Sequence, residues 1–243
     1  MKTDQASALL ALDTATEACS AAVVVGDTVL ARRFEPLQRG HAERLMPMVE
    51  AVMNEAGVNY KALGAIAVTV GPGSFTGVRV GLATARGLAL AAAVPLIGIS
   101  TLEALAAAVP ESEVEENRLL CALDALRGQV YAQWFDAAGG ALTPPMAASA
   151  TEAADALGPA RGLVVGSGAK AILAALEATG RGVIRRSHAP DWPDAAIFGR
   201  LVARRATHAG GAGRLAQGPV SPLYLRDAGA RPLEGFAAVN RPP

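Results

Sequence analysis

The sequence predicts an α/β protein of two lobes that repeat one order of elements. An apolar run that ends in a carboxylate occurs twice, as Ala8–Asp13 and as Leu119–Asp124. Each run is followed by a short turn and a second strand-like run, and short strands then alternate with segments of helical periodicity. Hairpin-linked strands followed by crossover helices imply a mixed sheet covered on both faces. This order, βββαβα given twice, predicts a duplicated ribonuclease-H-like architecture, the actin-like or ASKHA fold.

The first lobe, residues 1–110, begins with three predicted strands joined by tight turns. Gly26 and Asp27 form the second of these turns. The segment from His41 has apolar residues at helical spacing, and Gly57 stops it. Pro47 lies early enough in this helix to be tolerated, or it kinks the helix. The predicted elements are strand 8–13, turn 14–16, strands 19–25 and 28–34, helix 41–56, strand 65–70, a helix ending near Ala92, strand 96–99 and helix 101–109.

The second lobe, residues 111–218, is set off by an acidic segment, 110–117. Gly139 and Gly140 predict a hairpin turn within it. Asp194 is predicted to cap the last helix, because a carboxylate can accept hydrogen bonds from free N–H groups. The predicted elements are strands 119–124 and 129–135, helix 151–157, strand 163–165, turn 166–168, helix 169–179, strand 182–185 and helix 194–208. Residues 219–243 form a tail that is expected to pack back on the fold.

A glycine-rich stretch, Gly71–Gly77, lies between a buried strand and a long apolar helix. Its glycines and Pro72 break the strand, and Ser74 or Thr76 can cap the helix. Within the helix, small residues recur every four positions and form a ridge with almost no side chains: Gly77, Gly81, Ala85, Ala89 and Ala93. Glycine costs roughly 1 kcal/mol relative to alanine inside a helix, so another backbone should pack closely there. That backbone belongs either to the lobe's own sheet or to a helix of another subunit.

Two carboxylates raise the question of nucleotide chemistry. The glycine-rich stretch fits neither the dinucleotide fingerprint nor the Walker loop, because Thr76 and Val78 stand where each needs another residue. Asp13 and Asp124 could face each other across a cleft and hold Mg²⁺, or each could cap its own turn. The residues of this candidate nucleotide cleft are Asp13, Thr14, Asp124, Arg127, Gly166 and Gly168.

Metal-binding and membrane signals are missing from the sequence. None of the three histidines has a second histidine four residues on, and Leu45 follows His41 at that spacing. Cys19 and Cys121 lack metal spacing and are expected to be free thiols, as in a reducing cytoplasm. The longest charge-free stretches are shorter than a membrane span, and acids interrupt the N-terminal apolar run, so neither an anchor nor a secretory signal is predicted.

Charge is balanced overall but distributed unevenly. The formal net charge is zero, yet the segment from position 161 onward holds 12 basic and 5 acidic residues. This basic excess could face a polyanion, or arginines such as Arg204 and Arg205 could form an ordinary solvated surface.

Several motifs resemble those of the TsaB (YeaZ) family. They are Leu12–Thr16, His41–Pro47, the specific run Gly71–Gly81, Leu123–Arg127 with Val130-Tyr131, and Tyr224–Arg226. The resemblance spans the chain and is strongest over residues 8–105. Leu126 departs from it, because the family usually has alanine there.

The resemblance implies a cytoplasmic dimerisation subunit, without catalytic residues of its own, for making N6-threonylcarbamoyladenosine (t6A) next to the tRNA anticodon in bacteria. The implied partners are TsaD, a paralogue that carries the metal and transfers threonylcarbamoyl from its adenylate, the ATPase TsaE, and tRNA through the complex. TsaB lacks the His-x-x-x-His metal motif of TsaD, and Leu45 agrees with this. The chain alone is therefore expected to bind no metal or cofactor, while ATP or ADP can bind the assembled complex. The alternative from another class is an active ATPase or sugar-kinase-like enzyme that uses Asp13 and Asp124.

Two helices of the first lobe are expected to form the partner interface. The helix 41–56 and the glycine-faced helix would pair with their equivalents in TsaD, or in a second copy, as a four-helix contact. Small residues permit short interaxial distances, and flexible methionines suit a surface that fits more than one partner. The predicted interface residues are His41, Leu45, Met46, Val49, Met53, Phe75, Thr76, Gly77, Arg79, Val80, Gly81, Thr84 and Ala85.

Overall fold

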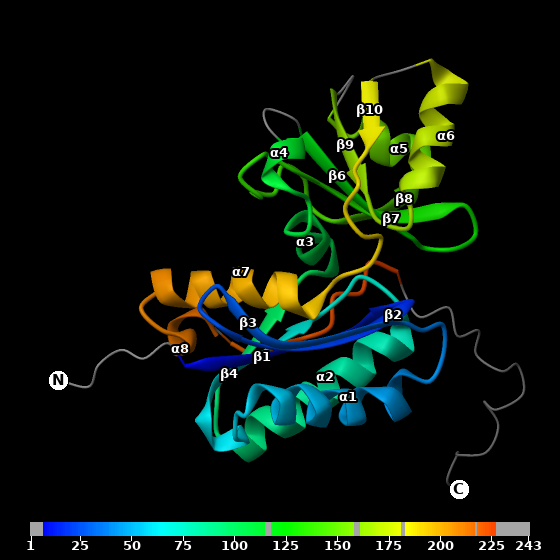
Figure 1. Cartoon of the computed structure of the whole chain (residues 1–243). Coiled ribbons are helices and arrows are strands. Elements are labelled where there is room, and N and C mark those ends of the chain that lie inside the picture. Colours follow the sequence, from blue (N-terminus) through cyan, green and yellow to red (C-terminus); the bar gives the residue numbers. More distant parts are fainter. Residues whose placement is uncertain (1–6, 115–117, 158–160, 181–182, 217, 227–243) are drawn as a thin grey trace, which may run out of the picture.

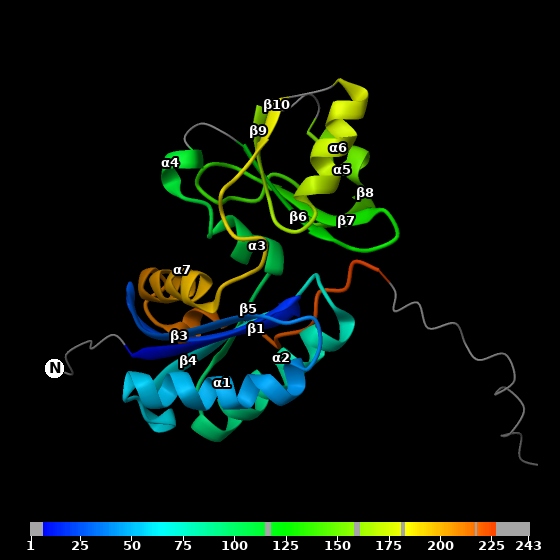
Figure 2. The same cartoon turned by 45° about the vertical axis from the view of Figure 1, so that its right-hand side comes forward.

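The computed structural model describes residues 7–114, 118–157, 161–180, 183–216 and 218–226. They form two lobes, one above the other in Figures 1 and 2. Each lobe holds a five-stranded mixed sheet, and both sheets have the same strand order, β3-β2-β1-β4-β5 in the first and β8-β7-β6-β9-β10 in the second. The repeated order confirms the predicted duplicated ribonuclease-H-like fold.

The first sheet joins three antiparallel strands to two parallel ones. β1 pairs antiparallel with β2, and β4 joins the other edge of β1 in parallel. β1, β2 and β4 are almost fully buried, because helices cover both faces of the sheet, and this explains their nearly continuous apolar sequences. The strands are β1 Ala8–Thr16, β2 Ala18–Val25, β3 Thr28–Pro36, β4 Leu63–Thr69 and β5 Leu96–Ile99.

Two helices lie side by side on one face of this sheet. They are α1 (His41–Ala56) and α2 (Phe75–Ala92), below the sheet in Figure 1. α1 has the predicted bounds, runs through Pro47 and ends at Gly57, whose φ of 63° is left-handed. Ser74 caps α2, because its hydroxyl oxygen accepts a hydrogen bond from the N–H of Gly77. A 3-10 turn, Tyr60–Ala62, leads from α1 into β4.

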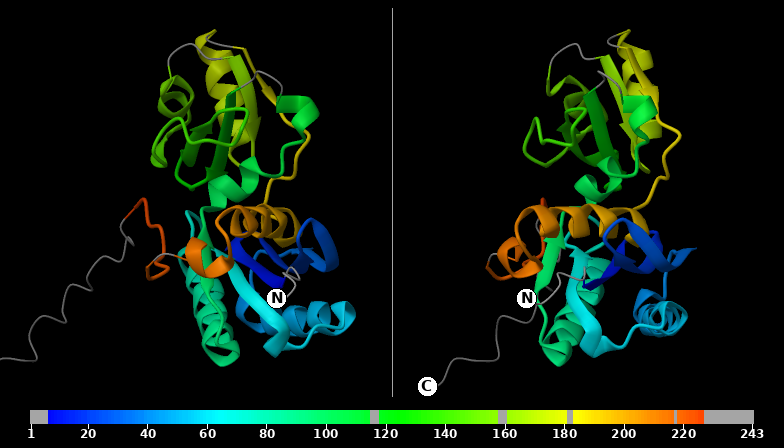
Figure 3. Two further views of the ribbon diagram at one scale, coloured as in Figure 1. Left: turned by 90° about the vertical axis from the view of Figure 1, so that its left-hand side faces the viewer. Right: turned by 60° about the vertical axis from the view of Figure 1, so that its left-hand side comes forward.

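The opposite face of the first sheet is covered by the last helices of the chain. α7 (Ala195–His208) packs Phe198 and Val202 against β1 and β2, and α8 (Ala212–Leu215) follows it. Figure 3 shows both helices over the first sheet. Residues up to 218 were predicted to belong to the second lobe, whereas the structure packs 195–216 on the first. The apolar spacing of α7 predicts a buried stripe but does not say which sheet it covers.

The second sheet forms its own core. Trp134 is completely buried, and its indole N–H donates a hydrogen bond to the carbonyl oxygen of Ala153. α3, assigned by sequence to the first lobe, also packs Leu102 and Leu105 into a cluster with β6. The remaining elements are α3 Thr101–Ala106, α4 Glu111–Val114, β6 Arg118–Asp124, β7 Gln129–Phe135, β8 Met146–Ser149, α5 Ala150–Asp155, β9 Arg161–Val165, α6 Ala169–Thr179 and β10 Val183–Arg186.

Several element boundaries differ from the prediction. β1 continues to Thr16 where a turn over 14–16 was expected, because an irregularity after Asp13 keeps the strand paired with β2. α3 ends at Ala106, three residues early. β8, α4 and α8 were not predicted, since each is only four residues long and shows no clear periodicity. Of the predicted strand 182–185, residue 182 lies outside the described residues.

The start of the predicted tail packs back on the fold as a strap, residues 219–226. The N–H of Leu223 donates to the carbonyl oxygen of Val70 at 2.7 Å, and Arg86 on α2 donates to the carbonyl oxygen of Val220 at 2.5 Å. At its far end, Arg226 donates to the carbonyl oxygen of Ala125, in the β6–β7 turn of the second lobe. The strap therefore contacts both lobes. Among the described helices, none combines the length and apolar character needed to cross a membrane.

Candidate functional site

The glycine-rich loop packs onto the end of β1. The N–H of Ser74 donates to the carbonyl oxygen of Ala15, and the Thr14 hydroxyl donates to the carbonyl oxygen of Gly77, both at 2.7 Å. A Cβ on Gly73 would lie 2.1 Å from the Ala15 oxygen, and one on Gly77 would lie 2.1 Å from the Thr14 oxygen. Only glycine permits these contacts. The two glycines therefore serve close packing between two parts of the backbone.

The small-residue ridge of α2 faces the same way. A Cβ on Gly81 would lie 2.6 Å from Oγ1 of Thr14 and 3.5 Å from the Val68 side chain. Ala85 and Ala89 are buried in the core of the first lobe. The ridge thus packs on β1 and β4, as in the helix-on-sheet alternative, and does not face outward to another subunit.

This orientation divides the predicted interface residues. Six of them lie in the first lobe's core, where a partner cannot touch them: Leu45, Val49, Met53, Gly77, Gly81 and Ala85. The other seven are exposed or half-buried: His41, Met46, Phe75, Thr76, Arg79, Val80 and Thr84. Gly77, Gly81 and Ala85 were included because α2 carries small side chains on two sides, so the sequence alone does not show which side faces the sheet. Leu45, Val49 and Met53 lie on α1, whose apolar side packs into the core of the first lobe.

An outer stripe of α2, Thr76, Val80, Ala83, Gly87 and Leu90, points away from the sheet. Its members follow at intervals of three or four residues, none is charged, and only Val80 is half-buried. Leu90 is 84% exposed, and a Cβ on Gly87 would meet nothing within 4 Å. Ala83, Gly87 and Leu90 were not among the predicted interface residues, although they form a second row of small and apolar residues on the same helix.

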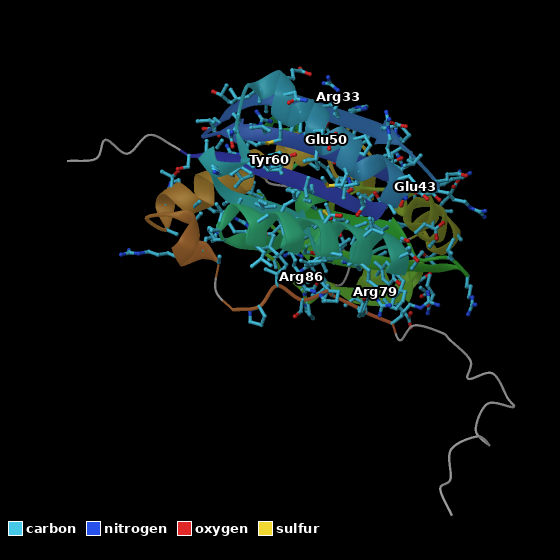
Figure 4. The ribbon with its side chains drawn as sticks, turned by 90° about the horizontal axis from the view of Figure 1, so that it is seen from below. Arg33, Glu43, Glu50, Tyr60, Arg79 and Arg86 are labelled. Atoms are coloured by element: carbon cyan, nitrogen blue, oxygen red, sulfur yellow. The ribbon has the colours of Figure 1, made fainter. Side chains whose placement is uncertain are left out.

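α1 presents an outer row beside this stripe. Its exposed residues Glu43, Met46, Glu50 and Asn54 also follow at helical intervals. Figure 4 looks onto both helices from below, with Glu43 and Glu50 on α1 and Arg79 and Arg86 on the far edge of α2. The outer surface of the lobe therefore has an uncharged strip on α2 between acidic and basic residues.

Asp13 does not line an open cleft. Its carboxylate is completely buried, and Oδ1 accepts hydrogen bonds from the Thr69 hydroxyl at 2.5 Å and the Ala15 N–H at 3.1 Å. Oδ2 has no partner among the described residues. The pKa of Asp13 is raised to about 7, mainly by burial and in smaller part by the nearby Asp194 carboxylate, while the two hydrogen bonds oppose the shift. A carboxyl group in this state is not arranged to hold Mg²⁺.

The equivalent position in the second lobe is different. Asp124 is exposed and caps its own turn, because Oδ1 accepts a hydrogen bond from the N–H of Leu126 at 2.8 Å. Its own N–H donates to the Ser167 hydroxyl, which brings the 166–168 turn beside β6. Gly166 and Gly168 pack against the backbone of Ala122, so close approach explains both. The structure thus gathers Asp124, Gly166 and Gly168, together with the exposed Arg127, but buries Asp13 and Thr14.

His41 and Leu45 both have structural roles in the first lobe. The Nε2 atom of His41 lies 2.9 Å from the carbonyl oxygen of Thr16, so this nitrogen carries the proton and donates it to the end of β1. Leu45 is completely buried in the first core. Within the described ranges, no group of three or more His, Cys, Asp or Glu side chains is placed to hold a metal ion.

Three arginines of the last third pair with carboxylates in separate parts of the molecule. Arg204 pairs with Asp27 at 3.4 Å, Arg205 with Glu103 at 2.5 Å and Arg186 with Asp191 at 2.6 Å. The first two lie on α7, over the first sheet, and Arg186 lies on β10 of the second lobe. Ordinary surface ion pairs therefore account for these arginines.

Comparison with known proteins identifies the relatives of this chain. The family model described as TsaD, tRNA N6-adenosine threonylcarbamoyltransferase, matches residues 34–183. The protein named "tRNA threonylcarbamoyladenosine biosynthesis protein TsaB" from Escherichia coli K12 is 46% identical over 123 residues, which cover 51% of this chain and 52% of that protein. The Bacillus subtilis protein of the same name is 35% identical over 134 residues, covering 55% and 57%. The matched segment thus spans about half the length of these curated relatives.

A solved structure extends the similarity to nearly the whole chain. YeaZ from Pseudomonas aeruginosa aligns with a TM-score of 0.72 and 31% identity, covering 90% of this chain and 100% of that one. Both the fold and the sequence of the described residues therefore agree with one family, and the chain belongs to the TsaB (YeaZ) family.

Proposed function

We propose that this chain is a subunit of the machinery that makes t6A in tRNA, and that it supports a TsaD paralogue without carrying out the transfer itself. The observation that carries the proposal is the similarity to proteins named for threonylcarbamoyladenosine biosynthesis, together with the match to the TsaD family model. TsaE and tRNA would join the assembled complex, and ATP or ADP would bind there and not to this chain alone. The chain would act in the cytoplasm, where tRNA is modified.

The surroundings of His41 and Leu45 on α1 support the proposal that this chain has no transfer site of its own. TsaD is expected to use two histidines four residues apart as metal ligands. Here the second position is Leu45, which is buried in the core, and the first is His41, which holds the end of β1. Leu45→His would place an imidazole among apolar side chains, so metal binding would require repacking of the lobe.

The outer surface of α1 and α2 is the proposed contact with the paralogue. The α2 outer stripe is uncharged, and its small residues Ala83 and Gly87 let a facing helix approach to an interaxial distance of roughly 8 Å. Leu90 and Met46 supply exposed apolar side chains of the kind that fill a partner's grooves. Because a TsaD paralogue shares this fold, its equivalent helices would complete a four-helix contact. A second copy of the chain could occupy the same surface when the paralogue is absent.

Gly87→Arg should disrupt this contact without unfolding the chain. Gly87 is exposed and has open space around its Cα, so the arginine fits the free chain but separates the two helices in the complex. A central contact of this type contributes about 2 kcal/mol or more, so affinity should fall at least about 30-fold. Light scattering of the chain mixed with the paralogue measures the complex, and thermal unfolding shows that the variant is folded.

Ala174→Arg is the matched control, because it adds the same charge to an exposed position on α6 of the second lobe. It should leave the complex intact. Undiminished binding by a folded Gly87→Arg variant would refute the α1/α2 surface as the contact, and equal losses in both variants would indicate a nonspecific charge effect.

A further inference from the structure

The strap brings Tyr224 against Phe75 and Arg79 of α2, so that two exposed aromatic side chains and a guanidinium group contact one another. Tyr224 on the strap and Phe75 at the start of α2 lie with ring centroids 5.2 Å apart. The Arg79 guanidinium carbon lies 3.7 Å from the centroid of the Phe75 ring, and its Nε donates to the Tyr224 hydroxyl at 2.9 Å. The two rings are nevertheless 38% and 41% exposed. The arrangement therefore holds aromatic and guanidinium surfaces rigidly and leaves part of each open to solvent.

The strap also links this cluster to the β6–β7 turn. Arg226 donates to the carbonyl oxygen of Ala125, next to Leu126 and Arg127. Leu126 and Arg127 have φ angles of 61° and 56°, a left-handed conformation that costs energy in residues other than glycine. This turn leaves Leu126 70% exposed and Arg127 exposed. We call the set Phe75, Arg79, Leu126, Arg127, Tyr224 and Arg226 the strap cluster.

The arginines of the strap cluster have no carboxylate partner, whereas six arginines elsewhere in the described residues do. Within the residues that the structure describes, neither Arg79, Arg127 nor Arg226 forms an ion pair with a carboxylate. Arg79 and Arg226 instead contact a hydroxyl and a carbonyl oxygen, and Arg127 reaches into solvent. By contrast, Arg32, Arg33, Arg44, Arg186, Arg204 and Arg205 all pair with acids. Three uncompensated cations beside two open rings therefore attract an anion that also has flat apolar faces.

We propose that the strap cluster binds single-stranded RNA, with bases stacking on Tyr224, Phe75 and the Arg79 guanidinium, and with phosphates contacting Arg127 and Arg226. Single-stranded RNA offers both features, because its unpaired bases stack on aromatic and guanidinium planes and its backbone carries one charge per nucleotide. The proposal rests on the proposed role in tRNA modification, and it gives this chain its own RNA contact. The strap cluster lies on the edge of α2 beside the strap, where Figure 4 shows Arg79, and the outer stripe remains available to the paralogue.

The experiment measures fluorescence anisotropy of a labelled single-stranded RNA of about twelve nucleotides with the full chain alone, over a range of salt concentrations. Saturable binding that weakens with salt is expected, since phosphate contacts release counterions. Arg127→Gln should lower the slope of log affinity against log salt by about 1. Tyr224→Leu should weaken binding about 5- to 150-fold, because one stacked base is lost, with little change in slope. Tyr224→Phe retains the ring and should keep most of the affinity.

Arg200→Gln is the matched control, because it removes an exposed arginine from α7, away from the strap cluster. It should change neither affinity nor slope. The proposal is overturned if the chain shows no saturable binding, if Arg127→Gln and Tyr224→Leu bind like the wild type, or if a polyglutamate peptide competes as well as RNA does. The last outcome would assign the surface to an acidic protein segment.

The failure of the RNA site and the failure of the proposed subunit role can be told apart. A chain that supports t6A formation but does not bind the RNA probe leaves the subunit role standing and removes the RNA site. A chain that binds the probe and yet has no effect on t6A formation keeps the RNA site and removes the subunit role.

Discussion

Gly77→Ala should destabilise the first lobe strongly, although it adds only one methyl group. The new Cβ would lie 2.1 Å from the carbonyl oxygen of Thr14, far inside van der Waals contact. Thr14 cannot yield easily, because its hydroxyl donates to the Gly77 carbonyl oxygen and β1 is fixed between β2 and β4. Either α2 or the end of β1 must shift. Overpacking of this kind costs about 1–3 kcal/mol, which lowers the melting temperature of a chain of this size by roughly 2–12 °C.

Gly87→Ala on the same helix is the matched control. A Cβ at Gly87 would meet nothing within 4 Å, so the alanine should stabilise α2 by about 0.5–1 kcal/mol through its better helix propensity. Thermal unfolding of the two variants beside the wild type measures both effects. If Gly77→Ala is as stable as Gly87→Ala, then α2 does not pack on β1 as described. Gly81→Leu should unfold the lobe for the same reason, since its side chain would point at Thr14 and Val68.

Asp13→Asn should make stability less dependent on pH. The folded pKa of Asp13 is raised from 3.8 to about 7 by burial, so the proton is held more tightly in the folded state. Below about pH 4 the carboxyl group is protonated in both states and costs nothing. As the pH rises to about 7, the unfolded chain loses the proton first and folding becomes progressively less favourable. The full loss is about 4 kcal/mol above pH 7, because each pKa unit corresponds to about 1.4 kcal/mol.

The asparagine carries no charge and should avoid this loss. Urea unfolding of both proteins between about pH 4 and pH 8 should show the variant gaining on the wild type as the pH rises, by up to about 4 kcal/mol. Near pH 4 the variant should be no more stable than the wild type. Oδ2 of Asp13 has no hydrogen-bond partner among the described residues, so the amide group that replaces it would also be buried without one. Asp124→Asn tests the same exchange at the exposed turn of the second lobe, where the effect should stay within about 1 kcal/mol. A pH-independent difference between wild type and Asp13→Asn would contradict the buried, proton-holding carboxyl.

Local signals explain what the sequence predicted well. The bounds of α1 follow from its apolar spacing and from Gly57, and α2 begins after Ser74 because a serine there can accept the Gly77 N–H. The apolar runs that end in Asp13 and Asp124 predicted two lobes of the same fold, because a strand buried on both faces is nearly continuous in apolar residues. The sequence therefore shows that Asp13 and Asp124 hold equivalent positions in the two lobes, although their surroundings differ.

The missed features depend on contacts between distant segments. Asp13 and Asp124 occupy equivalent positions, but only Asp13 is buried, where it accepts a hydrogen bond from Thr69 at the end of β4 and lies near Asp194. α7 packs on the first sheet although it follows the second. α2 has small residues on two sides, so its periodicity showed a stripe but not its direction. In the strap cluster, Phe75 and Tyr224 come together only because the strap crosses back over the start of α2.

The most direct test of the proposed role is t6A formation on tRNA by the purified TsaD paralogue, given threonylcarbamoyl adenylate, with and without this chain. We expect no product from the chain alone and a marked increase in product when the chain joins the paralogue. Gly87→Arg should abolish that increase, whereas Ala174→Arg should not. Product formed by the chain alone would contradict the claim that it is a supporting subunit, and a paralogue whose output is the same with and without the chain would contradict its role altogether.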